Sequence, residues 1–211
     1  CGKSHVVSLS PQTGSANDSN AGGYFAPFLK FSGWDVLEVQ GKAEQDVIIF
    51  IDGNKGEVTV QNYPYGDTNS YQLVEKLTER FALDEQDKAN ISIVSSGKGA
   101  ENSLLGILNF SWYDRKRGAV RYKQAARGGP GTVLRDKKVV AIIIKYAGIT
   151  GSINNPAKPE LLKKAGQRIT QEILSLDGIQ NGMRQTGTVN LLDHMNNHHC
   201  LPVHNFQYGT H

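Results

Sequence analysis

The segment that decides the fold runs from Asn20 to Asp35 and reads Asn-Ala-Gly-Gly-Tyr-Phe-Ala-Pro-Phe-Leu-Lys-Phe-Ser-Gly-Trp-Asp. Its start belongs to a stretch of small polar residues, 15–23, and such residues favour loop backbone over helix or strand. Aromatic residues and Leu29 then surround a single charged side chain, Lys30. We therefore expect a loop over 15–23 that leads into a mainly apolar segment.

On both sides of this segment, β-branched runs are separated by turn residues, a pattern typical of strands. The strand candidates are 6–9, 36–39, 47–51, 57–60, 91–94, 104–110, 119–122 and 138–145. One clear helix is expected over 68–82, because apolar residues repeat there at helical spacing and Asp67 or Thr68 can cap it. The pattern predicts an α+β fold with antiparallel-rich β-sheets and few helices.

The C-terminal part of the sequence differs from what precedes it. After Pro156 and Pro159 the pattern becomes helical, over 160–176 and again near 182–196. We place the boundary near residue 148. This gives an α+β domain over 1–148 and a mainly helical C-terminal segment over 149–211.

The bulk composition argues against two classes of protein. The 211 residues include 23 basic and 20 acidic side chains, a formal charge of +3, whereas nucleic-acid-binding proteins usually concentrate basic residues on one face. No apolar run approaches the roughly 20 residues of a membrane helix, and no signal peptide opens the sequence. Cys1 and Cys200 give no disulfide framework. We expect a cytoplasmic protein that binds neither nucleic acid nor a membrane.

Three glycine-rich segments, 20–23, 97–102 and 126–131, are candidates for binding phosphate. Glycine lets backbone N–H groups approach an anion closely, and Arg127 adds a fork of donors that suits phosphate. Each segment alone is more often a plain turn. The nucleotide fingerprints fail, because Leu134 and Asn102 stand where the third glycine of a Rossmann loop is required.

The C-terminal histidines form the one metal-like cluster in the sequence. It comprises His194, His198, His199, Cys200 and His204. On a helix His194 and His198 share a face, and such pairs can bind zinc. Histidines near a helix end are more often simply solvated, and we find neither a convincing carboxylate pair nor a Ser–His–Asp arrangement. We therefore assign no catalytic residue.

Several segments together resemble the aldehyde:ferredoxin oxidoreductase family. In that family an Asn-Ser-Gly-Gly-Tyr-Phe segment leads into Glu-Leu-Lys-Phe-Ala-Gly-Tyr-Asp, which is similar to Asn20–Asp35. Further matches occur in the family's order along the chain, one before this segment and the others after it. They are Ser-Pro-Gln-Thr-Gly at 10–14, Glu-Val-Gln-Gly-Lys-Ala at 38–43, Gly-Lys-Gly-Ala-Glu-Asn at 97–102, Ala-Arg-Gly-Gly-Pro-Gly at 126–131 and Leu-Pro-Val-His-Asn-Phe at 201–206.

The resemblance implies the N-terminal domain of such an enzyme, a base on which a tungsten (or molybdenum) bis-pterin cofactor lies. A magnesium ion links the two pterin phosphates, and the family pattern assigns it the backbone carbonyls of Asn20 and Gln124. The implied cofactor-binding residues are Lys3, Asn20, Ala21, Gly22, Gly23, Lys123, Gln124, Ala126, Arg127 and Gly128.

Three of these positions depart from the family pattern. Lys3 and Lys123 stand where the family has arginine, so the charge is kept and the bidentate fork is lost. Ala126 replaces a glycine, which would be unfavourable if the backbone there required a positive φ. Arg127 matches fully and is the firmest basic contact.

The resemblance further implies oxidation of aldehydes to carboxylic acids, with electrons passing through a 4Fe–4S cluster to ferredoxin. That cluster needs four thiolates and this chain has two cysteines, so the remaining domains or subunits of the oxidoreductase must hold it. Those parts and ferredoxin are the implied partners, and a homo-oligomer is possible. Two alternatives stay open: a family member acting on another carbonyl or thioester substrate, and a cofactor-free scaffold subunit.

Overall fold

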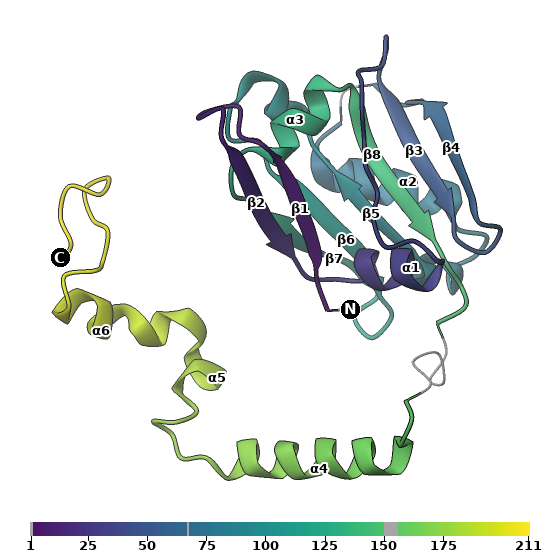
Figure 1. Ribbon diagram of the computed structural model, residues 1–211. Helices are drawn as coiled ribbons and strands as arrows, with labels where there is room; N and C mark the ends of the chain where they lie inside the picture. Colours follow the sequence, from purple (N-terminus) through teal and green to yellow (C-terminus); the bar gives the residue numbers. More distant parts are fainter. Residues whose placement is uncertain (1, 67, 150–155) are drawn as a thin grey trace. The chain divides into compact units, whose positions relative to one another are not determined.

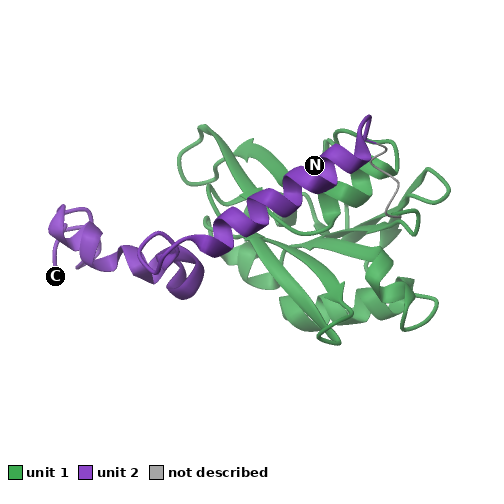
Figure 2. Ribbon diagram, turned by 90° about the horizontal axis from the view of Figure 1, so that it is seen from below, with its two compact units in different colours: residues 1–153 green, residues 154–211 purple. Residues whose placement is uncertain are grey.

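The computed structural model describes residues 2–66, 68–149 and 156–211, and the chain divides into two compact units, Cys1–Ile153 and Asn154–His211 (Figure 2). Asp67, one of the two predicted helix caps, and Cys1 lie outside the described residues. No helix in the described ranges is both long and apolar enough to cross a membrane.

Unit 1 is built on a six-stranded sheet with the order β4-β3-β8-β5-β6-β7 (Figure 1). Its strands are β3 (Val47–Asp52), β4 (Glu57–Asn62), β5 (Ile91–Ser95), β6 (Leu108–Asp114), β7 (Ala119–Ala125) and β8 (Val139–Lys145). All neighbours pair antiparallel except β3 and β8, which are parallel. The prediction of an α+β fold rich in antiparallel pairs is confirmed.

One face of the sheet is covered by helix α2 (Ser70–Phe81), and we call it the α2 face. The helix buries Leu73, Val74 and Leu77 almost completely against inward-facing isoleucines of β3, β5 and β8. Its N-cap is Asn69, whose side chain accepts hydrogen bonds from the backbone N–H groups of residues 71 and 72. The cap thus lies one residue beyond the predicted Thr68, and Asn is an equally good capping residue.

The opposite face of the sheet is covered by the antiparallel pair β1 (Ser4–Leu9) and β2 (Ala16–Ala21) and by helix α1 (Phe25–Phe31). We call it the hairpin face. Phe25 and Phe28 of α1 and Ala21 of β2 belong to its hydrophobic core. The expectation of a loop over 15–23 is wrong for 16–21, because pairing with β1 satisfies the backbone and overrides the turn-forming side chains.

Two other strand predictions need correction. Residues 36–39 form no regular strand, and Leu37 and Val39 instead pack against the core of the hairpin face. The strand expected over 104–110 begins only at Leu108, because residues 104–107 lie in the connection that follows a short 3-10 helix, η2 (Lys98–Asn102). A second one, η1 (Asp87–Asn90), precedes β5.

Helix α3 (Pro130–Asp136) enters directly from the glycine-rich segment that follows β7. Gly129 has φ of +73° and Pro130 occupies the first turn, where its missing N–H costs nothing. Unit 2 consists of helical elements, as predicted from the pattern beyond residue 159. They are α4 (Pro159–Ser175), α5 (Gly182–Thr186), η3 (Gly187–Leu191) and α6 (Leu192–Asn197).

Candidate functional site

The glycine-rich segment 126–131 meets β2 at the hairpin face, just before the segment 20–23. The side-chain amide of Asn17 donates to the backbone carbonyl of Arg127 at 3.0 Å, and the backbone N–H of Arg127 donates to Ser19 Oγ at 3.1 Å. Ser19 is buried, so this contact is shielded from water. Residues about 110 positions apart in the sequence are thus held together at the edge of β2.

The glycines that follow Arg127 are required by this close approach. Gly128 has φ of +74°, and a Cβ built on it would lie 1.8 Å from Asn17 Nδ2. Gly129 has φ of +73°, and its Cβ would lie 2.3 Å from the carbonyl oxygen of Leu104. Both positions need the left-handed backbone and the small volume that only glycine combines.

The segment Asn20–Gly23 closes the other end of the site. Asn20 is exposed and Ala21 is buried in the core. A Cβ on Gly22 would meet no atom within 4 Å, so Gly22 borders open space. Gly23 has φ of +111° and lies against the ring of Trp112, whose Cε3 would be 3.0 Å from an added Cβ. The Trp112 ring therefore packs against this turn at Gly23, whereas no protein atom fills the space beside Gly22.

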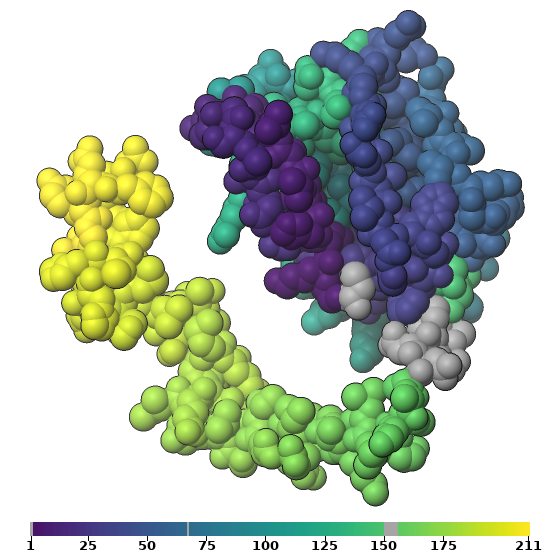
Figure 3. Space-filling view, in the orientation of Figure 1, coloured from purple at the N-terminus to yellow at the C-terminus, as the bar shows by residue number. Residues whose placement is uncertain are grey.

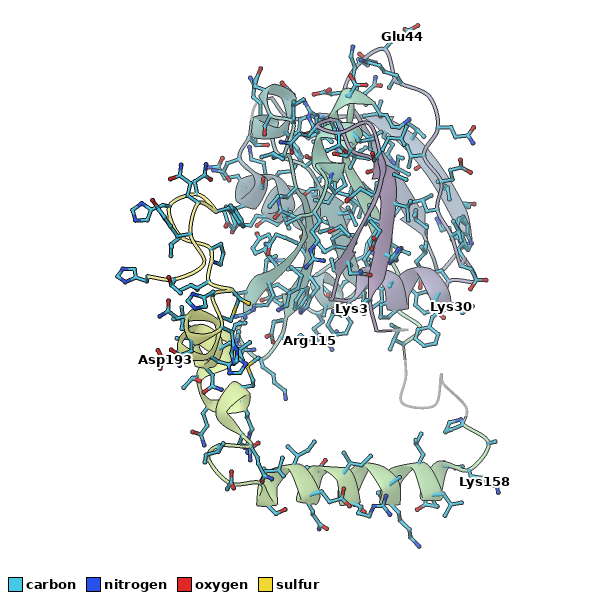
Figure 4. All side chains as sticks on the ribbon, turned by 60° about the vertical axis from the view of Figure 1, so that its left-hand side comes forward. Lys3, Lys30, Glu44, Arg115, Lys158 and Asp193 are labelled. Carbon is cyan, nitrogen blue, oxygen red and sulfur yellow. The ribbon has the colours of Figure 1, made fainter. Side chains whose placement is uncertain are left out.

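Lys3 lies beside this turn. It directly precedes Ser4, which pairs with Ala21. Continuing that register by one residue would put Lys3 opposite Gly22, and Figure 4 shows Lys3 at the start of β1. A strand rises about 3.3 Å per residue, so the three residues between Ser19 and Gly22 correspond to about 10 Å. Lys3 and the Arg127 backbone are thus roughly that far apart along β2.

The remaining predicted residues lie at the end of β7. Lys123 and Gln124 are exposed, and Gln124 Nε2 donates to Asn109 Oδ1 at 3.4 Å. Ala125 is fully buried in the same core as Ala21, which ties this end of β7 to β2. Ala126 does not have a positive φ, so the alanine found in place of a family glycine introduces no backbone strain there.

The site is electropositive and open. Among the described residues, Lys123 and Arg127 form no ion pair, so their charges are available to an anion. Asp18 is the acidic residue on β2, and its carboxylate lies 3.8 Å from His5 Nε2. The outer side of the β1–β2 pair lies on the surface of unit 1 (Figure 3). The site is therefore an exposed face and not an enclosed pocket.

The third glycine-rich segment serves a different part of unit 1. Residues 98–102 form η2, and Glu101 there is ion-paired with the buried Arg135 of α3. Arg135 also contacts Asp46 at 3.0 Å. Burial opposes the charge of Arg135, but the hydrogen bonds that its guanidinium donates to the carboxylates of Glu101 and Asp46 raise its pKa above the usual value. This segment is explained by an internal ion-pair cluster.

The C-terminal histidines do not assemble into a metal site within the described ranges. The rings of His194 and His198 lie 4.4 Å apart, as helical spacing predicts, but no group of three or more metal-ligating side chains is present there. The Cys200 thiol is exposed and donates to the carbonyl of His198 at 3.2 Å.

Four residues that shape the site belong to no sequence motif. Asn17 and Ser19 hold the Arg127 backbone, Trp112 supports Gly23, and His5 donates to Asn20 Oδ1 at 2.8 Å. Each acts across strand pairs or over a long sequence separation, which a local motif does not reveal.

Comparison with known proteins agrees with this description. Residues 1–146 match the model of the aldehyde ferredoxin oxidoreductase N-terminal domain. Tungsten-containing aldehyde ferredoxin oxidoreductases of Pyrococcus horikoshii and Thermococcus kodakarensis are 28% and 30% identical, each over 99% of this chain. The chain spans 32% of the length of these relatives, or about one third.

A solved structure shares the fold. It is the active-site complex BamBC of benzoyl coenzyme A reductase with 1,5-dienoyl-CoA, which superposes with a TM-score of 0.54 at 24% identity. The match covers 69% of this chain and 20% of the other. With the family model covering more than half of the sequence, the chain belongs to the aldehyde ferredoxin oxidoreductase family and contains its N-terminal domain.

Proposed function

We propose that unit 1 binds the pterin phosphates of a tungsten bis-pterin cofactor in an oxidoreductase that converts aldehydes to carboxylic acids and passes the electrons to ferredoxin. The observation that carries the proposal is the hydrogen-bonded junction of Arg127 with Asn17 and Ser19. It supports the proposal because it ties Arg127 to the strand that leads directly into the segment Asn20–Gly23.

The residues of this face fit a phosphate group. Gly22 borders open space in which no Cβ obstructs an approaching anion. The guanidinium of Arg127 supplies paired donors for bidentate binding, whereas the ammonium groups of Lys123 and Lys3 add positive charge but no paired donors. Main-chain carbonyls of Asn20 and Gln124 are oxygen ligands of the kind that magnesium prefers. The face can therefore hold two phosphates and the divalent ion between them.

The cofactor supplies the redox chemistry, and the protein supplies binding and orientation. Because the face is open, unit 1 covers one side of a ligand, whereas binding sites usually enclose most of a ligand's surface. The rest of the enclosure, the 4Fe–4S cluster and the ferredoxin contact belong in this proposal to the oxidoreductase polypeptide beyond this chain. That polypeptide corresponds to the two thirds of the relatives' length that this chain does not span.

Helix α4 offers a surface for packing against that polypeptide. Its apolar side chains Leu161, Leu162, Ile169 and Ile173 fall on one stripe, and none is buried within the described structure. An amphipathic helix normally buries such a stripe. In this proposal the segment 149–211 leads into the second domain. Ile169→Lys in the full-length protein should lower its thermal midpoint, whereas Lys163→Ala, on the polar side, should not.

The direct test is Arg127→Ala in the full-length oxidoreductase, purified from a host that makes tungstopterin. Loss of a charged hydrogen-bond donor, worth about 2 kcal/mol, should reduce tungsten retention about tenfold or more under competition. Arg80→Ala, an equally exposed arginine on α2, serves as the control. Unchanged tungsten content in Arg127→Ala would count against the proposal. A wild-type protein that never acquires tungsten would instead support the scaffold alternative.

A further inference from the structure

His5 and Asn20 form a contact on the outer side of the β1–β2 pair. The two residues are register partners, and exposure alternates along β1 so that His5, Val7 and Leu9 face outward. Lys3 directly precedes β1. The imidazole is therefore on the outward side of the pair beside Asn20, and the inward-facing Val6 packs on the core.

The polarity of the His5–Asn20 hydrogen bond is fixed by chemistry. The 2.8 Å contact joins His5 Nδ1 to the amide oxygen of Asn20, and a carbonyl-type oxygen can only accept, so Nδ1 is the donor. The NH2 group of Asn20 is then turned away from the ring. Among the described residues, no acceptor takes a hydrogen bond from it. His5 Nε2 is directed to the side of Asp18, 3.8 Å away.

This arrangement decides what Asn20 presents to an anion. An amide that is free to turn can offer either its oxygen, which repels phosphate, or its NH2 group, which binds it. Because Asn20 Oδ1 accepts the hydrogen bond from His5, the NH2 group of Asn20 is the part of its amide that remains for a ligand. We infer that His5 is a positioning residue that orients the Asn20 amide to donate to a pterin phosphate, in addition to the main-chain role proposed for Asn20. The inference rests on the proposed function.

The test compares two substitutions that place a donor at different points. In His5→Asn the side-chain NH2 group can occupy the position of Nδ1. In His5→Gln it lies one bond further out, on the side of Nε2, and misses Asn20. The full-length holoenzyme is used, and the readouts are tungsten and pterin content after gel filtration and the rate of pterin release on warming below the unfolding midpoint.

We expect His5→Gln to release pterin about fivefold faster than wild type, the effect of losing one hydrogen bond, and His5→Asn to stay close to wild type. Asn20→Asp keeps the backbone carbonyl and replaces the donor with a second acceptor, so it should lose more cofactor than His5→Gln. Circular dichroism of each variant establishes that the fold is intact.

Equal release rates in wild type, His5→Asn and His5→Gln would overturn the inference. So would full cofactor retention in Asn20→Asp. If Arg127→Ala loses tungsten while His5→Gln does not, the inference alone fails and the proposed function stands. If neither variant changes retention, both fail.

Discussion

The two faces of the unit 1 sheet are covered in different ways. On the α2 face a single helix buries Leu73, Val74 and Leu77 against the sheet. On the hairpin face the covering strands carry polar residues outward and are tied to the end of β7 by hydrogen bonds. Both faces bury an apolar core, but only the hairpin face borders the proposed binding segments, so substitutions in the α2 core should change stability without changing the proposed site.

The largest effect is expected from Leu77→Ala on the α2 face. Leu77 is fully buried, and removing its side chain leaves a cavity, so the free energy of unfolding should fall by about 3 kcal/mol. Urea unfolding followed by circular dichroism measures the change. Glu79→Ala on the exposed side of the same helix should change it by less than about 0.5 kcal/mol. Equal effects would show that the packing of α2 does not dominate stability.

Next in size is Asp87→Asn, which removes one partner of an ion pair at the end of β8. Lys145 Nζ lies 2.5 Å from Asp87 Oδ2, and both side chains are nearly buried. Burial acts to raise the pKa of Asp87, but hydrogen bonds from Lys145, Asn90 and the Leu83 N–H outweigh it and hold the pKa below its usual value. The substitution should cost about 2 kcal/mol at neutral pH.

The same carboxylate predicts an acid dependence. Because the pKa of Asp87 is lower in the folded state, its stabilisation is complete above about pH 4 and is lost as the pH falls through the folded pKa. The difference in unfolding free energy between wild type and Asp87→Asn should therefore shrink between about pH 4 and pH 2. A difference that does not change with pH would contradict this explanation.

A smaller loss of stability is expected on the hairpin face from Gly128→Ala. The added Cβ must adopt φ of +74° and displace the Asn17 amide, so the free energy of unfolding should fall by about 1.5 kcal/mol. Asn17→Ala removes the side chain that the Cβ would meet. If Gly128→Ala is no less destabilising in that background, the clash with Asn17 is not the cause.

The sequence predicted most of the sheet because its central strands are marked by composition. The runs 47–51 and 138–145 are β-branched and lie at the centre of the sheet, buried on both faces. Strand β2 was missed because Asn17, Asp18 and Asn20 favour turns, and only pairing with β1 makes the segment extended. Residues 36–39 were predicted as a strand and form none, because their apolar side chains pack on the core while their backbone pairs with no neighbouring strand.

For the site, the family motifs located Arg127 and Asn20 but not what connects them. The contacts of Arg127 with Asn17 and Ser19 depend on the way β2 crosses the end of β7, which no local pattern encodes. The family pattern has a glycine at position 126, but the φ of Ala126 is not positive, so this position does not require glycine. The motifs thus predict which residues bind the cofactor, while the contacts that hold those residues depend on the fold.

The central claim is that the open backbone around Gly22 receives a pterin phosphate. Gly22→Leu in the full-length oxidoreductase tests it most directly, because the added side chain meets no protein atom at its Cβ and enters only the space assigned to the ligand. Gly99→Leu, at an equally open glycine of η2, is the matched control. We expect Gly22→Leu to fold and to lose most of its tungsten and pterin, while Gly99→Leu retains both. Full cofactor content in a folded Gly22→Leu protein would contradict the account.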